Sequence, residues 1–110
     1  MTMLFLDILL GGIYKIDNPD VLAGILRGLE HLAYDPDDRT MEGIRLVMGK
    51  AKYDDINLMA AACDCLTALM RFGSNETASA AISSIFYIIK GPYSNIIQNY
   101  ARQKIKNIVK

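Results

Sequence analysis

The chain has 110 residues, 52% of them apolar, which is enough for the core of one domain and excludes the composition of a disordered chain. Twelve Lys and Arg side chains balance twelve Asp and Glu side chains, which excludes a strong overall field for nucleic acid or membrane. The balance is uneven: residues 77–110 hold five bases and no acid, whereas residues 1–76 hold seven bases and twelve acids, a net charge of −5.

Helices are predicted along the whole chain, because apolar residues recur three or four positions apart and no strand-like alternation is sustained. Asn18 before Pro19 and Asp35 before Pro36 place a capping side chain next to a proline suited to a first helical turn. The six predicted helices span residues 3–16, 19–34, 37–52, 55–72, 75–90 and 93–109.

The later helices have boundary residues of their own. Asp54 and Ser74 are expected to cap the fourth and fifth helices, and Gly73 is expected to end the fourth. Gly91–Pro92 is expected to end the fifth. The short connections require each helix to run antiparallel to the one before it.

The apolar pattern recurs with a period of 37–39 residues, and each period contains two helical faces. The first face consists of Leu6, Leu9, Leu10, Ile13; then Ile44, Val47, Met48, Ala51; then Ile82, Ile85, Phe86, Ile89. The second consists of Val21, Ile25, Leu29, Leu32; then Leu58, Ala62, Leu66, Leu69; then Ile97, Ala101, Ile105, Ile108. This period predicts an all-α fold of three stacked antiparallel hairpins in one domain, with repeats at about 1–35, 36–73 and 74–110.

The second helix of each repeat resembles that of a HEAT repeat. The pattern Asp17-x-Pro19-x-Val21-x-x-x-Ile25-x-x-Gly28-Leu29-x-x-Leu32 carries the resemblance, residues 54–69 fit the same template, and residues 92–108 fit it in apolar spacing alone. The basic residue that often follows the Val in HEAT repeats is replaced here by Leu22, Met59 or Gln98. The resemblance implies a short right-handed α-solenoid that acts as a protein-binding scaffold, with the second helices lining its inner surface.

Two cysteines and an apolar first segment bear on location. Cys63 and Cys65 lie about 200° apart around a predicted helix, so they cannot bridge each other, and a reduced cytoplasmic protein is expected. Residues 3–16 are too short to span a bilayer, and removing them as a signal peptide would delete half of a repeat.

The two ends of the predicted stack differ. One flank of the second helices changes from Leu22, Leu26, Met59 and Cys63 to Gln98, Arg102 and Lys106. A polar flank is what a terminal repeat requires, so we expect the stack to end with this chain.

The first helix, in contrast, carries Leu4, Phe5 and Ile8 where the later first helices carry smaller or more polar residues. Two interpretations stay open: these residues form an interface with a second copy or a partner, or they fold back under the second repeat.

Two further surfaces are candidates for binding. The outward side of the second helices carries the possible partner-binding residues Asp20, Arg27, Glu30, Asp64 and Gln103. Arg27 and Asp64 occupy equivalent positions and could pair with each other or recognise a partner's charges. The possible anion-binding patch near the C-terminus consists of Lys90, Arg102, Lys104, Lys106 and Lys110, which could instead be a solvated cap.

No catalytic, cofactor-binding or metal-binding residues are predicted, since His31 is the only histidine and Ser83, Ser84 and the tyrosines have no histidine partner. The function expected from the sequence is therefore a non-enzymatic protein–protein interaction scaffold that self-associates or binds a partner through helix 1. The alternative is a nucleic-acid or acidic-surface binding protein that uses the basic C-terminal hairpin.

Overall fold

The computed structural model describes residues 2–32 and 38–108, with the side chains of 6–32 and 39–108. Across these ranges the chain forms six helices and no strand. The helices are α1 (Thr2–Lys15), α2 (Pro19–His31), α3 (Asp38–Lys50), α4 (Ile56–Phe72), α5 (Asn75–Lys90) and α6 (Asn95–Ile108). The all-α prediction is confirmed, and the predicted bounds differ from these by three residues or fewer.

Local capping explains where several helices begin and end. Asn18 Oδ1 accepts hydrogen bonds from the backbone N–H groups of Asp20 at 2.9 Å and Val21 at 3.2 Å, so the predicted start of α2 is confirmed. Ser74 caps α5 as predicted, with 3.2 Å between its Oγ and the amide nitrogen of Thr77. Gly73 and Gly91 follow the last residues of α4 and α5.

The predicted cap at Asp54 is wrong. Asp55 is the residue that precedes α4, and its side chain makes no capping bond. The Asp55 carboxylate instead accepts a hydrogen bond from the Lys52 amide at 2.7 Å, because the loop turns back on itself before the helix begins. The predicted cap at Asp35 lies outside the described residues.

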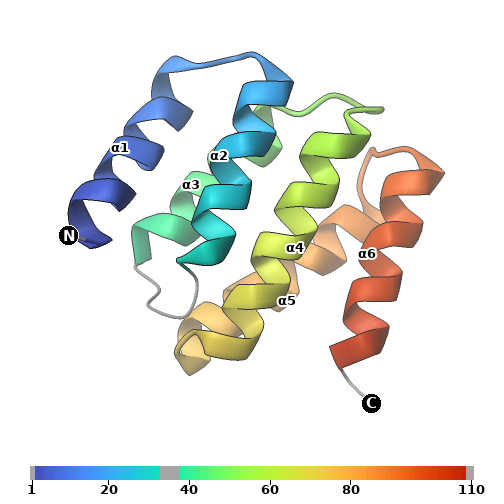
Figure 1. Ribbon diagram of the computed structural model, residues 1–110. Helices are drawn as coiled ribbons and strands as arrows, with labels where there is room; N and C mark the ends of the chain where they lie inside the picture. The colour runs from blue at the N-terminus through green and yellow to red at the C-terminus, as the bar shows by residue number, and fades with distance from the viewer. Residues whose placement is uncertain (1, 33–37, 109–110) are drawn as a thin grey trace.

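The helices form two layers (Figure 1). α2, α4 and α6 lie side by side in front, in the order of the chain, and α3 and α5 lie behind them. α1 contacts α2 and α3, and α3 in turn contacts α5. α4 is central, because it contacts α2, α3, α5 and α6.

The core is continuous between the two layers and is centred on α4. Leu58, Met59, Leu66 and Leu69 of α4 are almost completely buried. Each such side chain contributes roughly 1.5–3 kcal/mol through removal of its apolar surface from water. The other large, fully buried side chains are Ile13, Leu22, Leu26, Leu29, Ile44, Ile85, Ile88 and Ile97. No helix in the described parts of the chain has the length and apolar character needed to cross a membrane.

The predicted core face of α5 is confirmed in part, since Ile85 is buried and Ile89 is partly buried against the core. Ile82 and Phe86 are 39% and 44% exposed, and Ala81, Ser84 and Ile88 are buried instead. The end of α5 is apolar on most sides, so the sequence fits more than one rotation of the helix, and packing selects the one that buries Ala81, Ser84, Ile85 and Ile88. Val21 is likewise 46% exposed, because the core side of α2 is formed by Leu22, Leu26 and Leu29.

The flank of α2, α4 and α6 predicted to change from apolar to polar residues does so. Leu22, Leu26, Met59 and Cys63 are buried, whereas Arg102 and Lys106 are exposed. Cys63 and Cys65 are both free and buried, as predicted.

Several contacts tie α1 to α3, among them an ion pair of 2.5 Å between Asp7 Oδ1 and Arg39 Nη1. Lys50 Nζ donates to the backbone oxygens of Ile13 at 2.6 Å and Ile16 at 2.9 Å, which satisfies carbonyl groups at the C-terminal end of α1. Gly43 lets the two helices approach, since a Cβ atom at this position would lie 2.7 Å from Leu10 Cδ2.

Candidate functional site

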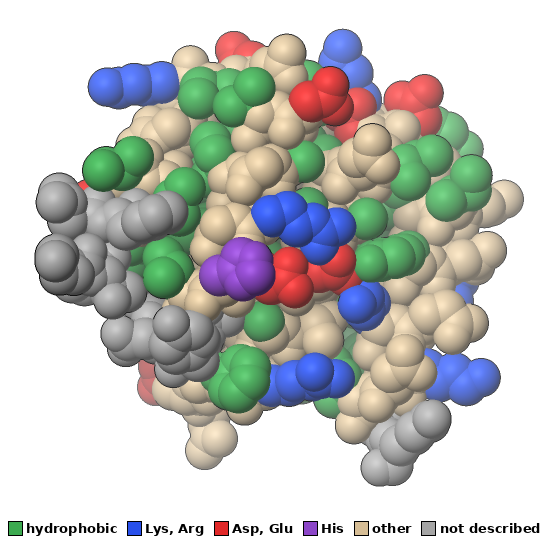
Figure 2. Space-filling view, in the orientation of Figure 1, with side chains coloured by type: hydrophobic (Ala, Val, Ile, Leu, Met, Phe, Trp, Pro, Cys, Tyr) green, Lys and Arg blue, Asp and Glu red, His purple; other side chains and the backbone are tan. Residues whose placement is uncertain are grey.

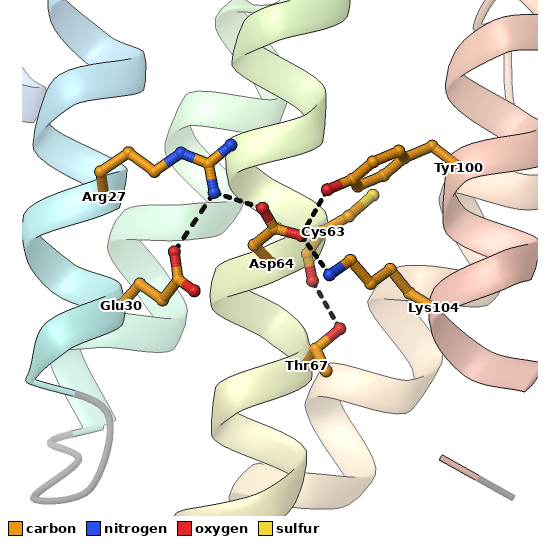
Figure 3. Close-up of polar contacts among 7 residues, drawn as sticks. All are labelled: Arg27, Glu30, Cys63, Asp64, Thr67, Tyr100 and Lys104. Atoms are coloured by element: carbon orange, nitrogen blue, oxygen red, sulfur yellow. Dashed lines mark hydrogen bonds and ion pairs between the residues drawn. The ribbon is translucent and has the colours of Figure 1, made fainter. Parts of the chain in front are cut away.

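A cluster of charged side chains occupies the centre of the face formed by α2, α4 and α6, where acidic and basic groups alternate (Figure 2). Asp64, in the middle of α4, is contacted from both sides (Figure 3). Its Oδ2 forms an ion pair with Arg27 of α2, and its Oδ1 accepts a hydrogen bond of 2.7 Å from Tyr100 Oη. Lys104 Nζ lies 2.7 Å from the same Oδ1, and Glu30 lies 3.2 Å from Arg27 Nη1. We call these five residues the Asp64 network.

These residues lie level with one another on α2, α4 and α6, at separations close to the predicted repeat. Arg27 precedes Asp64 by 37 residues, and Tyr100 follows Asp64 by 36, so each separation is close to one repeat. Lys104 follows Tyr100 by one helical turn, and its ammonium group lies 5.4 Å from the centroid of the Tyr100 ring. The network therefore joins three helices that belong to three different predicted repeats.

The surroundings of Asp64 keep it ionised. Burial raises the pKa of its carboxyl group, but hydrogen bonds from Lys104, Arg27 and Tyr100 outweigh burial, and the pKa lies below its ordinary value. The hydrogen bond with Asp64 raises the pKa of Arg27 and of Lys104. Burial, followed by the hydrogen bond to Asp64, raises the pKa of Tyr100. At neutral pH the Asp64 carboxylate thus lies between two cations and a neutral phenol.

Beside the network the surface is hollowed by a cavity of about 270 Å³. It is lined by Glu30, His31, Asp64, Thr67, Ala68, Arg71, Phe72, Lys104 and Asn107. Phe72, at the end of α4, is 57% exposed at its edge. Among the residues that the structure describes, no group of three or more His, Cys, Asp or Glu side chains is placed to hold a metal ion.

The structure brings together three of the five predicted partner-binding residues. Arg27, Glu30 and Asp64 belong to the Asp64 network, so of the two roles left open for Arg27 and Asp64 the structure shows the pair. Asp20 is exposed and lines a separate hollow at the start of α2 and α4. Gln103 is exposed on α6, and no described residue forms a hydrogen bond with its side chain.

The predicted anion-binding patch is divided. Lys104 is not free to bind a phosphate, because its ammonium group is held by Asp64. Arg102 and Lys106 are exposed on α6, and Arg102 Nη1 donates to Asn99 Oδ1 at 2.8 Å. Lys90 is exposed at the end of α5, and Lys110 lies outside the described residues.

Of the predicted interface residues in helix 1, Ile8 is described, and it is 67% exposed. The alternative in which this residue folds back under the second repeat is therefore wrong. The side chains of Leu4 and Phe5 lie outside the described residues.

Sequence reasoning missed Tyr100 and Lys104 as partners of Asp64. A signal was present, because counting one repeat forward from Asp64 leads to the turn of α6 that carries both residues. That turn was instead interpreted as part of a free basic surface. Spacing shows which positions are level, but it does not show which of several long side chains reaches the carboxylate.

Comparison with known proteins gives one informative similarity. The chain is 30% identical over 90 residues to an uncharacterized protein of Treponema pallidum (strain Nichols). The match covers 82% of this chain and 17% of the relative, so it relates the six-helix chain to one segment of a longer protein. No protein-family model matches the chain. No solved structure matches it either.

Proposed function

We propose that this chain is a non-enzymatic protein-interaction module that self-associates through the outer edge of α1. Ile8, which is 67% exposed, carries the proposal. Leu4 and Phe5 precede Ile8 by four and three positions, a spacing that places all three on one side of a helix. Contiguous apolar groups on one side of a surface helix are typical of an interface.

The contacts of α1 support this edge as the point of association. Among the described residues α1 packs against α2 and α3 alone, whereas α4 packs against four helices. The core side of α1 is occupied by Leu6, Leu10 and Ile13, which are buried. A second copy of α1 would cover Ile8 without any change in that core.

We also propose that the six helices form a short HEAT-like stack of three hairpins. Two observations support the stack. The second helices form one layer in chain order, and the helices that contact each other are one or two places apart in the chain. Stacks of this kind present edges and extended surfaces to other proteins. The interaction function and the architecture are therefore consistent with each other.

The test is the mass of the protein in solution, measured by light scattering during gel filtration. We expect a dimer for the natural chain and a folded monomer for Ile8→Glu. Ile96→Glu is a matched control, since Ile96 on α6 is 62% exposed. Circular dichroism checks that each variant is helical. A monomeric natural chain, or an Ile8→Glu variant that stays dimeric, would contradict self-association through α1.

The nucleic-acid alternative loses support from the geometry, because Lys104 is held within the Asp64 network. We expect no binding of a short DNA or RNA duplex even at low salt. Affinity that falls steeply with added salt would contradict the proposal and favour the basic hairpin.

A further inference from the structure

A second cavity lies between α3 and α5, in the layer that does not carry the Asp64 network. Its volume is about 380 Å³. It is lined by Arg45, Met48 and Gly49 of α3, Ser83, Ser84 and Tyr87 of α5, and Tyr93 of the following loop. We call it the α3–α5 cleft.

Its walls are fixed by aromatic and backbone contacts. The rings of Tyr87 and Tyr93 meet edge to face, with centroids 6.4 Å apart and planes at 78°. Tyr93 is buried, and its Oη donates to the backbone oxygen of Met48 at 3.5 Å. Gly49 borders open space, because a Cβ atom there would meet nothing within 4 Å.

The polar groups of the cleft are available to a ligand. Arg45 is the one charged residue among the seven lining residues, and none of the seven is acidic. Across the described part of the chain, no residue pairs with the Arg45 guanidinium or forms a hydrogen bond with the hydroxyl groups of Ser83 and Ser84. Ser84 is 7% exposed, so its hydroxyl group borders the cleft from a largely buried position.

Two further charges lie near the cleft. Glu76 lines a neighbouring hollow together with Arg45, but it forms no ion pair with the guanidinium. Lys90 follows Ser83 by seven positions, so it emerges on the same side of α5 about two turns further along, outside the lining of the cleft.

The partial negative charge at the end of α3 disfavours an anion in the cleft, but the full positive charge of Arg45 outweighs it. The cleft borders the last turn of α3, where unpaired carbonyl groups carry a partial negative charge. Arg45 carries a full charge five residues before that end, and Tyr93 already satisfies the Met48 carbonyl group. The balance of charge in the cleft is positive.

We propose that the α3–α5 cleft binds an oxyanion, phosphate or carboxylate, that is attached to an aromatic ring. The guanidinium of Arg45 and the hydroxyl groups of Ser83 and Ser84 bind the oxyanion. The ring packs against Met48 and the exposed Tyr87. This site is independent of the proposed association through α1.

Titrations followed by amide NMR shifts test the proposal with four probes: phenyl phosphate, benzoate, inorganic phosphate and phenol. We expect phenyl phosphate or benzoate to shift the amide signals of Arg45, Gly49 and Ser84. Whichever of the two binds more tightly shows whether the cleft prefers a phosphate or a carboxylate. Inorganic phosphate and phenol are each expected to bind at least about tenfold more weakly, because each lacks half of the contacts.

Two variants and their controls locate the site. Arg45→Gln is expected to weaken binding of the tighter-binding probe at least about tenfold. Arg102→Gln, at an exposed arginine of α6, is expected to leave that affinity unchanged. Gly49→Leu fills the cleft and abolishes binding, whereas Gly24→Leu, at another open helical glycine, does not. Absence of any shift in the natural chain, equal affinity in Gly49→Leu, or shifts that map to the cavity beside Asp64 would each overturn the proposal.

Discussion

At the scale of single residues, the structure assigns the charged side chains at the centre of the α2/α4/α6 face to internal contacts. Asp64 illustrates this, because its two oxygens are shared among Arg27, Tyr100 and Lys104. An exposed ion pair contributes little to stability. Asp64 differs because its side chain is 10% exposed, so its hydrogen bonds are partly shielded from water.

Asp64→Asn is expected to lower the free energy of unfolding by about 1–2 kcal/mol at neutral pH, since Arg27 and Lys104 lose their carboxylate but remain partly exposed to water. The pKa of Asp64 in the folded state lies below its ordinary value of 3.8. Its contribution is therefore complete above pH 3.8 and disappears as the pH falls through the folded-state pKa. Urea unfolding of both proteins across this range measures the difference.

The matched control is Asp54→Asn, because Asp54 is exposed in a loop and its side chain forms no hydrogen bond or ion pair with a described residue. We expect this control to change stability by less than about 0.5 kcal/mol. A constant difference between Asp64→Asn and the natural chain from neutral pH to far below pH 3.8 would rule out the ionised network as the cause.

The two cysteines give a residue-scale prediction about reactivity. Burial raises the pKa of Cys63 and of Cys65 to about 12. The reactive thiolate is then scarce at mildly alkaline pH, and both side chains are inaccessible to solvent. A thiol-specific dye is expected to label both residues promptly in guanidinium chloride and very slowly in native buffer. Fast labelling of the native chain would show that α4 opens more often than its packing suggests.

At the scale of helices, the packing depends on how closely neighbouring helices approach and on how each helix is rotated about its axis. α1 and α3 meet at Gly43, where Leu10 Cδ2 and Ile13 Cδ1 occupy the space that a side chain would need. α5 is rotated so that Ala81 and Ser84 face inward, which leaves Ile82 and Phe86 exposed. Both features depend on small residues that allow backbones to approach.

Two glycine substitutions separate helix propensity from packing. Gly24→Ala is expected to raise the free energy of unfolding by about 0.5–1 kcal/mol, since the new methyl group meets nothing within 4 Å. Gly43→Ala gains the same propensity but must displace buried Leu10, so we expect its stability to lie at least about 1 kcal/mol below that of Gly24→Ala. Chemical denaturation measures the free energy of unfolding of both variants. Equal values would show that α1 moves away from the new methyl group without loss of stability.

The helix starts and ends were largely predictable, because caps act within one turn. Asn18, Ser74 and Gly73 perform the roles that their positions indicate. The rotation of α5 was not predictable in the same way. Its apolar residues surround most of the helix, so periodicity alone fits more than one orientation, and only the neighbours α3 and α4 select one.

At the scale of the whole molecule, stability is distributed unevenly around α4. This helix contacts four others, and nine of its residues are buried. α1 contacts two helices and retains an exposed apolar side chain at Ile8. An arrangement of this kind opens first at its edges.

Hydrogen exchange is expected to show this gradient. The amides of α4 should have the highest protection, close to that of global unfolding, and those of α1 should exchange faster. Peptide-resolved exchange measured by mass spectrometry at increasing urea concentration checks the order. Equal protection of α1 and α4 at every urea concentration would contradict an edge that opens independently. Measurement with Ile8→Glu shows whether dimerisation protects α1.

The sequence by itself determined the all-α class, the six helices and their order, because helix periodicity and caps are local properties of the chain. The tertiary structure alone decided which polar groups are free. Lys104 forms an ion pair with Asp64 and is not part of a free basic patch. Arg45, which no sequence pattern singled out, borders an open cleft. The physical reason is that a long side chain reaches several partners, and its choice depends on helix rotations that are fixed only when all the helices pack together.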